Sequence, residues 1–500
     1  MNPEKGDIKG SKKGVYLGNY AVKAPSPGIR GLQGIPTLTE NTQPPSLKTP
    51  SKTPSNVFDL DARIVENFAL QEMARKAVLT DYYSTPEEKR DKKPHRVCNC
   101  RRDLRPLLVG KTTSGQNQYE MSQPSLFKHK ETGKVFLGGT LICGSPYACS
   151  MCAPKINEAN ALEIRNAVSQ WVASGGICLF VTLTFPHQRS DSFVSLMKCF
   201  KSALRRFRRG RSFDSIKSEL GYFSVIQSVE ATWGDVNGWH PHSHEIWFVQ
   251  PDFLLKAMDC LGLSLSEVTR MSKAAKEYFL DDMKLSIYNK WRLAVLASGL
   301  SEPSYQRGVN IQIAETEEEV QKRIAEYLTK TGVEKPPWGV DDELTRHTTK
   351  RGKPGRFTPF DFLRNQLNPE FSKDEKAQFL SLFAEYVKGM YRIRKIYWAP
   401  GLKAHFKIDE KTDEQKAEEQ TEAADLFYDI PRPVWVFVIA LQDHRAELVL
   451  TAQNDGIEAA KSFLIGLLDK YADYLGYRFS ELSASSQYIL ESYNFNPEKG

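Results

Sequence analysis

The sequence has few cysteines and no long apolar segment. Only 8 of its 500 residues are Cys, too few for a scaffold held together by disulfide bonds, so clustered cysteines indicate a metal site in a reducing compartment. No apolar run reaches the roughly 18 residues that a membrane-spanning helix requires, and the first residues contain no apolar signal core. We therefore expect a cytoplasmic protein that binds no membrane. Hydrophobic residues make up 40% of the chain, which excludes a wholly disordered protein.

Two segments lack the hydrophobic pattern of a folded domain. Residues 1–60 are rich in Pro, Gly, Ser, Thr and Lys, which predicts a disordered arm. Residues 409–425 hold eight acidic side chains against two lysines and are typical of a solvated linker. Residues 430–500 then combine an apolar stretch with a helical pattern, enough for a small α/β module of unknown role.

The hydrophobic pattern of residues 157–405 predicts an α+β domain that combines a sheet with helices. An apolar run at 177–185 is typical of a buried strand. Strand-like runs at 222–230 and 241–249, joined by a segment with Gly and Asn, predict an antiparallel hairpin. A further strand is expected at 309–313, and helices at 157–172, 192–209, about 253–298 and 316–330, the last opened by a capping box.

Three of the nine histidines lie in one predicted strand, as His240, His242 and His244. Because side chains alternate along a strand, all three lie on one face. Two imidazoles at this spacing can hold one divalent ion, together with a third protein ligand and open positions for substrate oxygens. We expect His242 and His244 to be the ligands, with His240 as a further candidate and Glu230, which ends the partner strand, as the third ligand. The alternative is a surface strand with incidental histidines.

Tyr327 and Lys330 are three residues apart in a predicted helix, so they project from neighbouring parts of one face. Alone, such a tyrosine is more typical of a helix core. Near a metal site, a tyrosyl oxygen aided by a cation can attack phosphorus, and the covalent link preserves the phosphodiester energy for rejoining. Other tyrosines in helical, Lys-containing sequence are alternative nucleophiles: Tyr278, Tyr288 and Tyr386.

Five cysteines form a cluster in the sequence. Cys143, Cys149 and Cys152 follow Cys98 and Cys100, offering five thiols for the four tetrahedral positions of a structural zinc ion. The downstream three are the better candidates, because they include the closely spaced C-x-x-C pair. A set of free thiols is the alternative. Residues 95–156 are accordingly expected to form a cysteine-rich zinc segment.

Basic residues gather in three runs that can follow a phosphate backbone. Aromatic residues interleave with the third run, so exposed bases can stack there. For any single run, a solvated helix face is the alternative. The candidate DNA-binding residues are Arg205, Arg206, Arg208, Arg209, Lys350, Arg351, Arg392 and Arg394.

Three motifs occur in order: Phe180-Val181-Thr182-Leu183-Thr184, then His240-Pro241-His242-Ser243-His244, then Tyr327-Leu328-Thr329-Lys330. Together they resemble the HUH endonucleases. More closely, the residues from Asn237 to His244, the cysteine block from Cys143 to Ile156 and Tyr397-Trp398-Ala399-Pro400-Gly401-Leu402-Lys403 look like bacterial rolling-circle plasmid replication initiators. The resemblance covers about residues 95–405.

This resemblance implies a DNA nickase built on an antiparallel sheet, which binds a plasmid origin and works with host helicase and polymerase. It implies that His242 and His244 hold Mg²⁺ or Mn²⁺, that Tyr327 forms a 5′-phosphotyrosine and leaves a 3′-OH primer, and that Lys330 assists. The sequence departs from the family at Arg323, where some initiators carry Glu or a second Tyr, and at Ser243, where a bulky apolar residue is usual between the ligands.

Two other functions remain compatible with the sequence. An HUH transposase would share every catalytic motif and differ in its DNA target, although the cysteine block and the Trp398–Leu402 segment favour the plasmid initiator. A non-catalytic, zinc-dependent DNA-binding regulator would bind DNA without metal-dependent cleavage.

Overall fold

The computed structural model describes residues 60–250, 273–314, 356–418, 424–439 and 443–472, except Lys92 and Thr113. The expected disordered arm lies outside these residues. All described residues belong to one compact unit, Asp59–Gly500. Among the helices described, none has the length and apolar character needed to cross a membrane.

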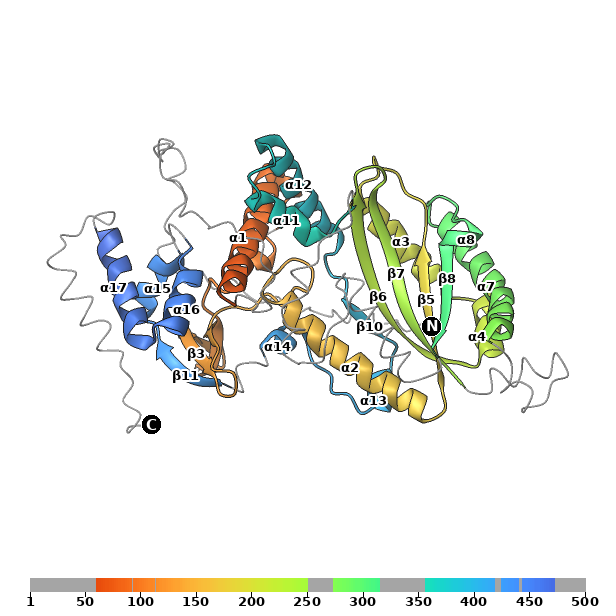
Figure 1. The fold of residues 1–500 in the computed structure, drawn as a ribbon, viewed down its shortest axis with the longest axis horizontal. Helices are drawn as coiled ribbons and strands as arrows, with labels where there is room; N and C mark the ends of the chain where they lie inside the picture. Colours follow the sequence, from red (N-terminus) through yellow and green to blue (C-terminus); the bar gives the residue numbers. More distant parts are fainter. Residues whose placement is uncertain are drawn as a thin grey trace, which may run out of the picture. The chain divides into compact units, whose positions relative to one another are not determined.

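A six-stranded antiparallel sheet forms the centre of the fold (Figure 1), as the sequence predicts. Its strand order is β10-β6-β7-β5-β8, and β9 also pairs with β6. The predicted hairpin is confirmed as β6 and β7, which are paired along their whole length. Gly238 begins β7 with φ of +69°, where a Cβ atom would come 2.8 Å from Cα of Arg189. The strands are β5 (Ile177–Thr184), β6 (Tyr222–Gly234), β7 (Gly238–Val249), β8 (Val309–Ala314), β9 (Arg356–Phe357) and β10 (Ile396–Trp398).

Helices cover the two faces of this sheet unequally. Against one face pack α3 (Phe193–Phe207), α4 (Arg211–Leu220) and α7 (Lys273–Leu296), and the apolar stripe of α3 is buried there. Against the other face pack α2 (Ala153–Ala173) and α13 (Leu402–His405). These two helices contact the apolar side chains at one end of the strands, such as Phe180 and Phe248. The same face carries the histidines toward the other end of β7, because its side chains alternate.

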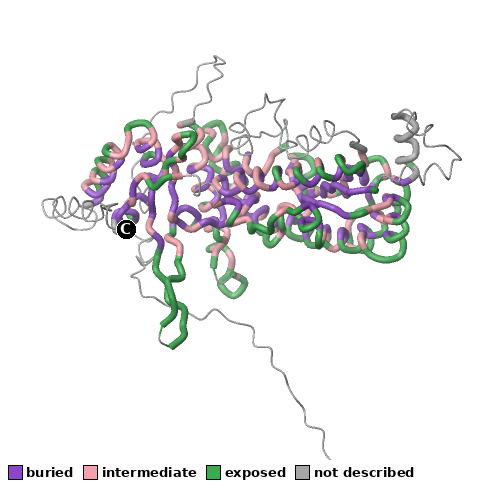
Figure 2. The backbone as a smooth tube through the Cα atoms, turned by 90° about the horizontal axis from the view of Figure 1, so that it is seen from below, coloured by how far each residue is buried: buried purple, intermediate pink, exposed green. Residues whose placement is uncertain are grey.

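A second helical group is formed by α1 (Leu60–Ser84), α11 (Pro359–Leu367) and α12 (Lys373–Gly389), which pack on one another. Capping boxes start α11 at Thr358 and α12 at Ser372. The strands β1 (Pro106–Lys111) and β2 (Asn117–Met121) form an exposed hairpin, drawn green in Figure 2. Short helical elements are Glu87–Lys89, Arg96–Asn99 and α8 (Tyr305–Gly308).

The C-terminal residues fold together with the cysteine-rich segment rather than apart from it. β11 (Ala424–Asp429) pairs with β3 (Ser125–His129), which pairs with β4 (Val135–Gly138). The helices α15 (Arg432–Ile439), α16 (Arg445–Asn454) and α17 (Ile457–Ala472) share a core with this sheet. The helices of the expected module at 430–500 therefore pack on strands from 125–138 and from 424–429, a strand that begins at the end of the expected linker.

The segment expected to be a solvated linker is partly packed. It contains α14 (Asp413–Glu418), whose Lys416 is buried and lies 2.7 Å from the Glu163 carboxylate of α2. Lys403 lies 2.9 Å from the other oxygen of Glu163. A half-buried acid with two lysine partners fixes this segment to α2, and the sequence composition alone contains no sign of that pairing.

Candidate metal centre

Two histidines and a glutamate from the β6–β7 hairpin meet on one face of the sheet. Glu230 lies opposite His242 in the strand register, as the sequence suggested. Glu230 Oε2 is 3.8 Å from His242 Nε2 and 4.0 Å from His244 Nε2. One donor atom from each residue lies within 4.8 Å of the others. This is a three-ligand arrangement that leaves further positions around an ion open.

Hydrogen bonds on the far side of each imidazole orient the two histidines. His242 Nδ1 is 3.1 Å from the carbonyl oxygen of His240. Because a carbonyl only accepts, Nδ1 carries the proton and Nε2 keeps its lone pair. His244 Nδ1 is 3.1 Å from Oγ1 of Thr182 on β5. A hydroxyl can accept from Nδ1, and in that tautomer the Nε2 lone pair of His244 is also free. Such partners are typical of metal-bound histidines.

The electrostatics of the site keep the imidazole in the form that binds metal. Burial lowers the pKa of His242 to about 4, with a smaller contribution from neighbouring His244, so the ring is neutral at pH 7. The carboxylate of Glu230 has a second partner, because its Oε1 is 3.2 Å from Nζ of Lys395. Imidazole nitrogens together with a carboxylate oxygen are a donor set that fits a divalent cation.

His240 has a different partner from the other two histidines. Its Nδ1 is 2.7 Å from Nε2 of His187, whose Nδ1 is 2.8 Å from the carbonyl oxygen of Asn237. Since that carbonyl accepts from His187, the His187 Nε2 accepts in turn from His240. Burial lowers the pKa of His240 to about 3, and His242 adds to the shift. His187 lies far from the other histidines in the sequence, so no local pattern marks it as part of this group.

The expected nucleophile Tyr327 and its companion Lys330 lie outside the described residues, as do Arg323, Lys350 and Arg351. The surroundings of two of the alternative tyrosines are described by the structure. Tyr386 is buried and stacks with Trp239, and burial raises its pKa far above the ordinary value. The hydroxyl of Tyr288 donates to the carbonyl oxygen of Pro303 at 2.9 Å. Both hydroxyls are therefore poorly suited to attack.

Four of the five clustered cysteines converge in a second centre. Cys100, Cys143, Cys149 and Cys152 are buried, with sulfurs within 4.8 Å of one another. Adjacent sulfurs are 3.6 or 3.7 Å apart, close to the edge of about 3.8 Å expected for a tetrahedron with Zn–S bonds of about 2.3 Å. The fifth candidate, Cys98, is buried but is not one of this group. The arrangement is compatible with zinc.

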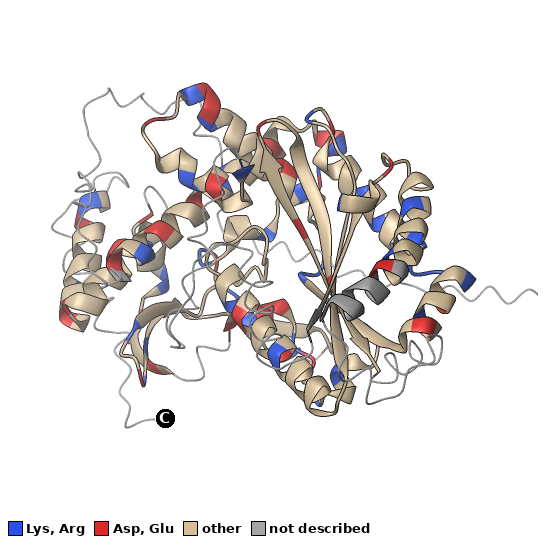
Figure 3. Cartoon of the chain, turned by 45° about the vertical axis from the view of Figure 1, so that its right-hand side comes forward, with Lys and Arg blue, Asp and Glu red and all other residues tan. Residues whose placement is uncertain are grey.

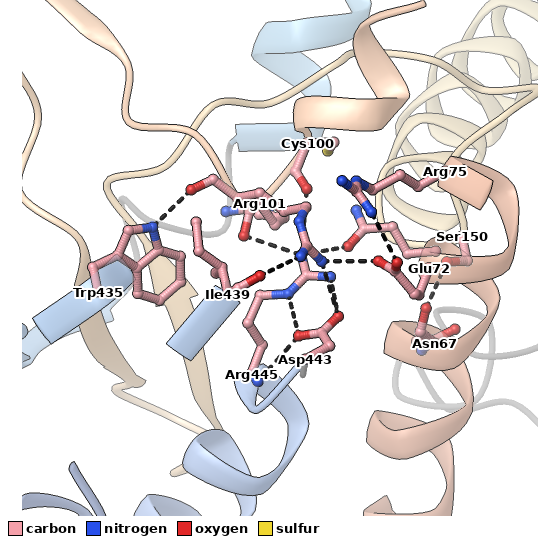
Figure 4. A network of polar contacts seen from close by, with 12 residues as sticks. Asn67, Glu72, Arg75, Cys100, Arg101, Ser150, Trp435, Ile439, Asp443 and Arg445 are labelled. Carbon is pink, nitrogen blue, oxygen red and sulfur yellow. Dashed lines mark hydrogen bonds and ion pairs between the residues drawn. The ribbon is translucent and has the colours of Figure 1, made fainter. Parts of the chain in front are cut away.

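A buried arginine ties the C-terminal helices to the cysteine centre (Figure 4). Arg445 is fully buried at the start of α16 and pairs with Asp443. Its Nη1 donates to the carbonyl oxygen of Cys100 at 3.3 Å and to Oε1 of Gln71 at 2.7 Å. The amide of Gln71 donates in turn to the sulfur of Cys149 at 3.4 Å. The cysteine centre and α16 thus share one polar network.

The basic run at the C-terminal end of α3 contains two kinds of arginine. Exposed Arg205, Arg206 and Arg209 line a hollow of about 590 Å³ together with Lys290 of α7. Arg208 instead donates to Glu245, which is fully buried, and to Gln227. Figure 3 colours the positions of Lys and Arg blue along the helices around the sheet. Arg392 and Arg394 are also exposed, so among the described candidates Arg208 alone is held by a buried acid.

The chain is similar in sequence to two curated proteins. Protein rep of Streptomyces lividans is 27% identical over 312 residues, covering 54% of this chain and 65% of that protein. The Neomycin resistance protein of Streptomyces cyanogenus is 28% identical over 148 residues, covering 25% of this chain and 34% of that protein. The chain thus spans less than two thirds of the length of the curated relatives it matches. No protein-family model and no solved structure matches it. Over about half its length, the chain is Rep-like.

Proposed function

We propose that this chain is a plasmid rolling-circle replication initiator, which nicks and rejoins one DNA strand at the origin. The similarity to Protein rep supports a role in replication. The observation that carries the chemistry is the convergence of Glu230, His242 and His244 on one sheet face, with both Nε2 atoms directed at the same carboxylate oxygen.

The donor set fits Mg²⁺ or Mn²⁺, and its two imidazoles favour Mn²⁺ of the two. The bound ion would polarise a phosphate oxygen and stabilise the charge that develops on it. The His240 carbonyl keeps His242 in the ligand tautomer, and the Thr182 hydroxyl can accept from Nδ1 of His244 in the corresponding tautomer. A second, structural ion, Zn²⁺, is assigned to the four cysteines.

Tyr327 is the proposed nucleophile, from its place in the motif order, with Lys330 as the nearby cation. The tyrosyl oxygen forms a bond to phosphorus while the bond from phosphorus to the 3′ oxygen breaks. The phenolic proton leaves to solvent, and the 3′ oxygen takes up a proton to become a 3′-OH primer. The 5′-phosphate remains on Tyr327, which retains the energy needed for rejoining.

The decisive experiment mixes the full chain with single-stranded origin DNA and Mg²⁺ or Mn²⁺, followed by denaturing gel electrophoresis. The native protein should give a covalent adduct that maps to Tyr327, and Tyr327→Phe should give none. Tyr386→Phe is the matched control and should still form the adduct. An adduct that persists in Tyr327→Phe contradicts the assignment of the nucleophile. Binding of the DNA without any cleavage would favour the zinc-dependent regulator, and cleavage at transposon ends would favour the transposase.

A further inference from the structure

A lysine outside the predicted catalytic motifs lies at the metal centre. Lys395 directly precedes β10, which pairs with β6 opposite Ser228, two residues before Glu230. Its Nζ is 3.2 Å from Glu230 Oε1, while Glu230 Oε2 is the oxygen that faces both histidines. One carboxylate group therefore separates the ammonium from the position of the ion.

Tyr147 holds this lysine in place from the other side. The ring centroid of Tyr147 is 5.7 Å from Lys395 Nζ, within the range of a cation–π contact. The Tyr147 hydroxyl donates to the carbonyl oxygen of Arg394 at 3.2 Å, next to the lysine in the chain. Tyr147 is itself buried, and it lies between Cys143 and Cys149. The cysteine centre thus supports the loop that positions Lys395.

The Lys395 ammonium keeps donors for a further partner. An ammonium carries three N–H groups, and within the described part of the chain its oxygen partner is Glu230 Oε1. Its side chain is 17% exposed, so it is not sealed in the core. The remaining donors suit an anion that comes to the face shared by Glu230 and the histidines.

The charge balance of the site indicates which anion fits. The negative charge of Glu230 is balanced by Lys395, and imidazoles that bind a metal ion do so in the neutral form. A divalent ion would therefore leave the site with about two net positive charges by formal count. Such a site favours a phosphate group that gains negative charge during displacement.

We propose that Lys395 binds the phosphodiester group of a nucleic acid strand at this centre, beside the metal ion held by Glu230, His242 and His244. The inference rests on the proposed function for the metal site and adds a substrate-binding residue to it. Lys395 donates to a non-bridging phosphate oxygen, and Tyr147 with Glu230 keeps it oriented.

The test uses the full, zinc-loaded chain with Mn²⁺ and the dinucleotide dTpdT, whose single phosphodiester is followed by ³¹P relaxation. Bound Mn²⁺ should speed relaxation in the native protein. Lys395→Met should weaken dTpdT binding roughly tenfold, the effect of losing one charge-assisted hydrogen bond. Free Mn²⁺ measured by electron paramagnetic resonance should show unchanged or tighter metal binding in this variant, because a nearby positive charge is gone.

Lys461→Met is a matched control in α17. Like Lys395, Lys461 pairs with a glutamate, Glu458, at 2.8 Å, and its Nζ lies 5.7 Å from the ring centroid of a tyrosine, Tyr428. This variant should leave dTpdT binding unchanged. Lys395→Arg keeps the charge and should restore most of the affinity, which guards against misfolding of the Met variant.

Three results would overturn the inference. The first is that Lys395→Met binds dTpdT as tightly as the native protein does. The second is that Lys395→Met loses Mn²⁺ affinity to the same extent as dTpdT affinity, which would mean that Lys395 only supports Glu230. The third is that bound Mn²⁺ does not speed ³¹P relaxation in the native protein. The outcome of the covalent-adduct assay for the proposed function does not depend on the outcome of this binding test. Phosphodiester binding that depends on Lys395, without an adduct, would contradict the nicking function and leave this inference standing.

Discussion

The hydroxyl of Thr182 on β5 lies 3.1 Å from Nδ1 of His244 on β7, directly opposite it in the strand register. This contact connects the first and second of the sequence motifs. When the imidazole donates to this hydroxyl, His244 is in the tautomer whose Nε2 lone pair is directed toward Glu230.

Replacing Thr182 by Val should lower the Mn²⁺ affinity of the centre about 10- to 100-fold, because partners of metal-bound histidines have effects of this size. Calorimetric titration of the zinc-loaded protein measures it. Thr184→Val is the control, since Thr184 lies on the same face opposite His242 and its buried Oγ1 has no hydrogen-bond partner in the described structure. Equal affinities for the two variants would contradict the role of Thr182.

Replacing Cys149 by Ala should lower zinc content and melting temperature together, because three thiolates cannot complete a tetrahedral site. Elemental analysis and thermal unfolding measure the two effects. Cys98→Ala should retain zinc, since Cys98 is outside the four-sulfur group. Zinc that survives in the Cys149 variant, or is lost in the Cys98 variant, would show that the centre has another ligand set.

Replacing Arg445 by Met should lower the free energy of unfolding by about 3–5 kcal/mol, because it leaves Asp443 largely buried without its main partner. Urea unfolding measures the change. Arg75→Met removes an arginine 34% exposed that pairs with Glu72, and should cost less than about 1 kcal/mol. Similar losses in both variants would contradict the central place of Arg445 in the network.

Arg206 and Arg208 should respond differently to replacement by Gln. Arg206→Gln should make the slope of log binding constant against log salt concentration for single-stranded DNA less steep by about 0.7, which is the effect of losing one phosphate contact. The free energy of unfolding should not change. Arg208→Gln should cost about 3 kcal/mol of stability, because Glu245 is fully buried. Fluorescence anisotropy at several salt concentrations and urea unfolding separate the two. An unchanged slope in Arg206→Gln would remove α3 from the DNA-binding surface.

Protonation of His95 should lower the free energy of unfolding in acid. Burial, aided by Arg96, lowers its pKa from 6.5 to about 4 in the folded state. The unfolded chain therefore binds a proton that the folded chain does not, so stability is full above pH 6.5 and falls as the pH drops to about 4. The shift corresponds to roughly 3 kcal/mol. Urea unfolding at pH 7.5 and 4 should show a smaller fall in His95→Gln than in the native protein, and equal falls would contradict it.

Local sequence patterns were sufficient to predict the β6–β7 hairpin and the face of β7 that carries the histidines. The period of two places His242 and His244 together, and the hairpin turn brings Glu230 opposite His242. Both relationships depend on residues close in the chain, so they can be read without knowing the rest of the fold.

Which residues of the cysteine cluster and of the basic run take part in a contact depends on the path of the chain in three dimensions. Cys98 and Cys100 are equivalent in sequence, and the turn around them decides that Cys100 alone joins the sulfur group. Arg206 and Arg208 stand in one basic run, yet Arg206 lies on the exposed side of α3 whereas Arg208, which caps the end of the helix, reaches Glu245. Neither distinction has a sequence signal of its own.

The sequence by itself determined the antiparallel hairpin, the paired histidines and the cysteine cluster, because strand alternation and short spacing impose them locally. Only the tertiary structure decided that Lys395 meets Glu230, that His187 meets His240 and that Arg445 reaches the cysteine centre. The physical reason is that these contacts join segments from 53 to 345 residues apart. Their geometry follows from strand pairing and helix packing, which no local pattern encodes.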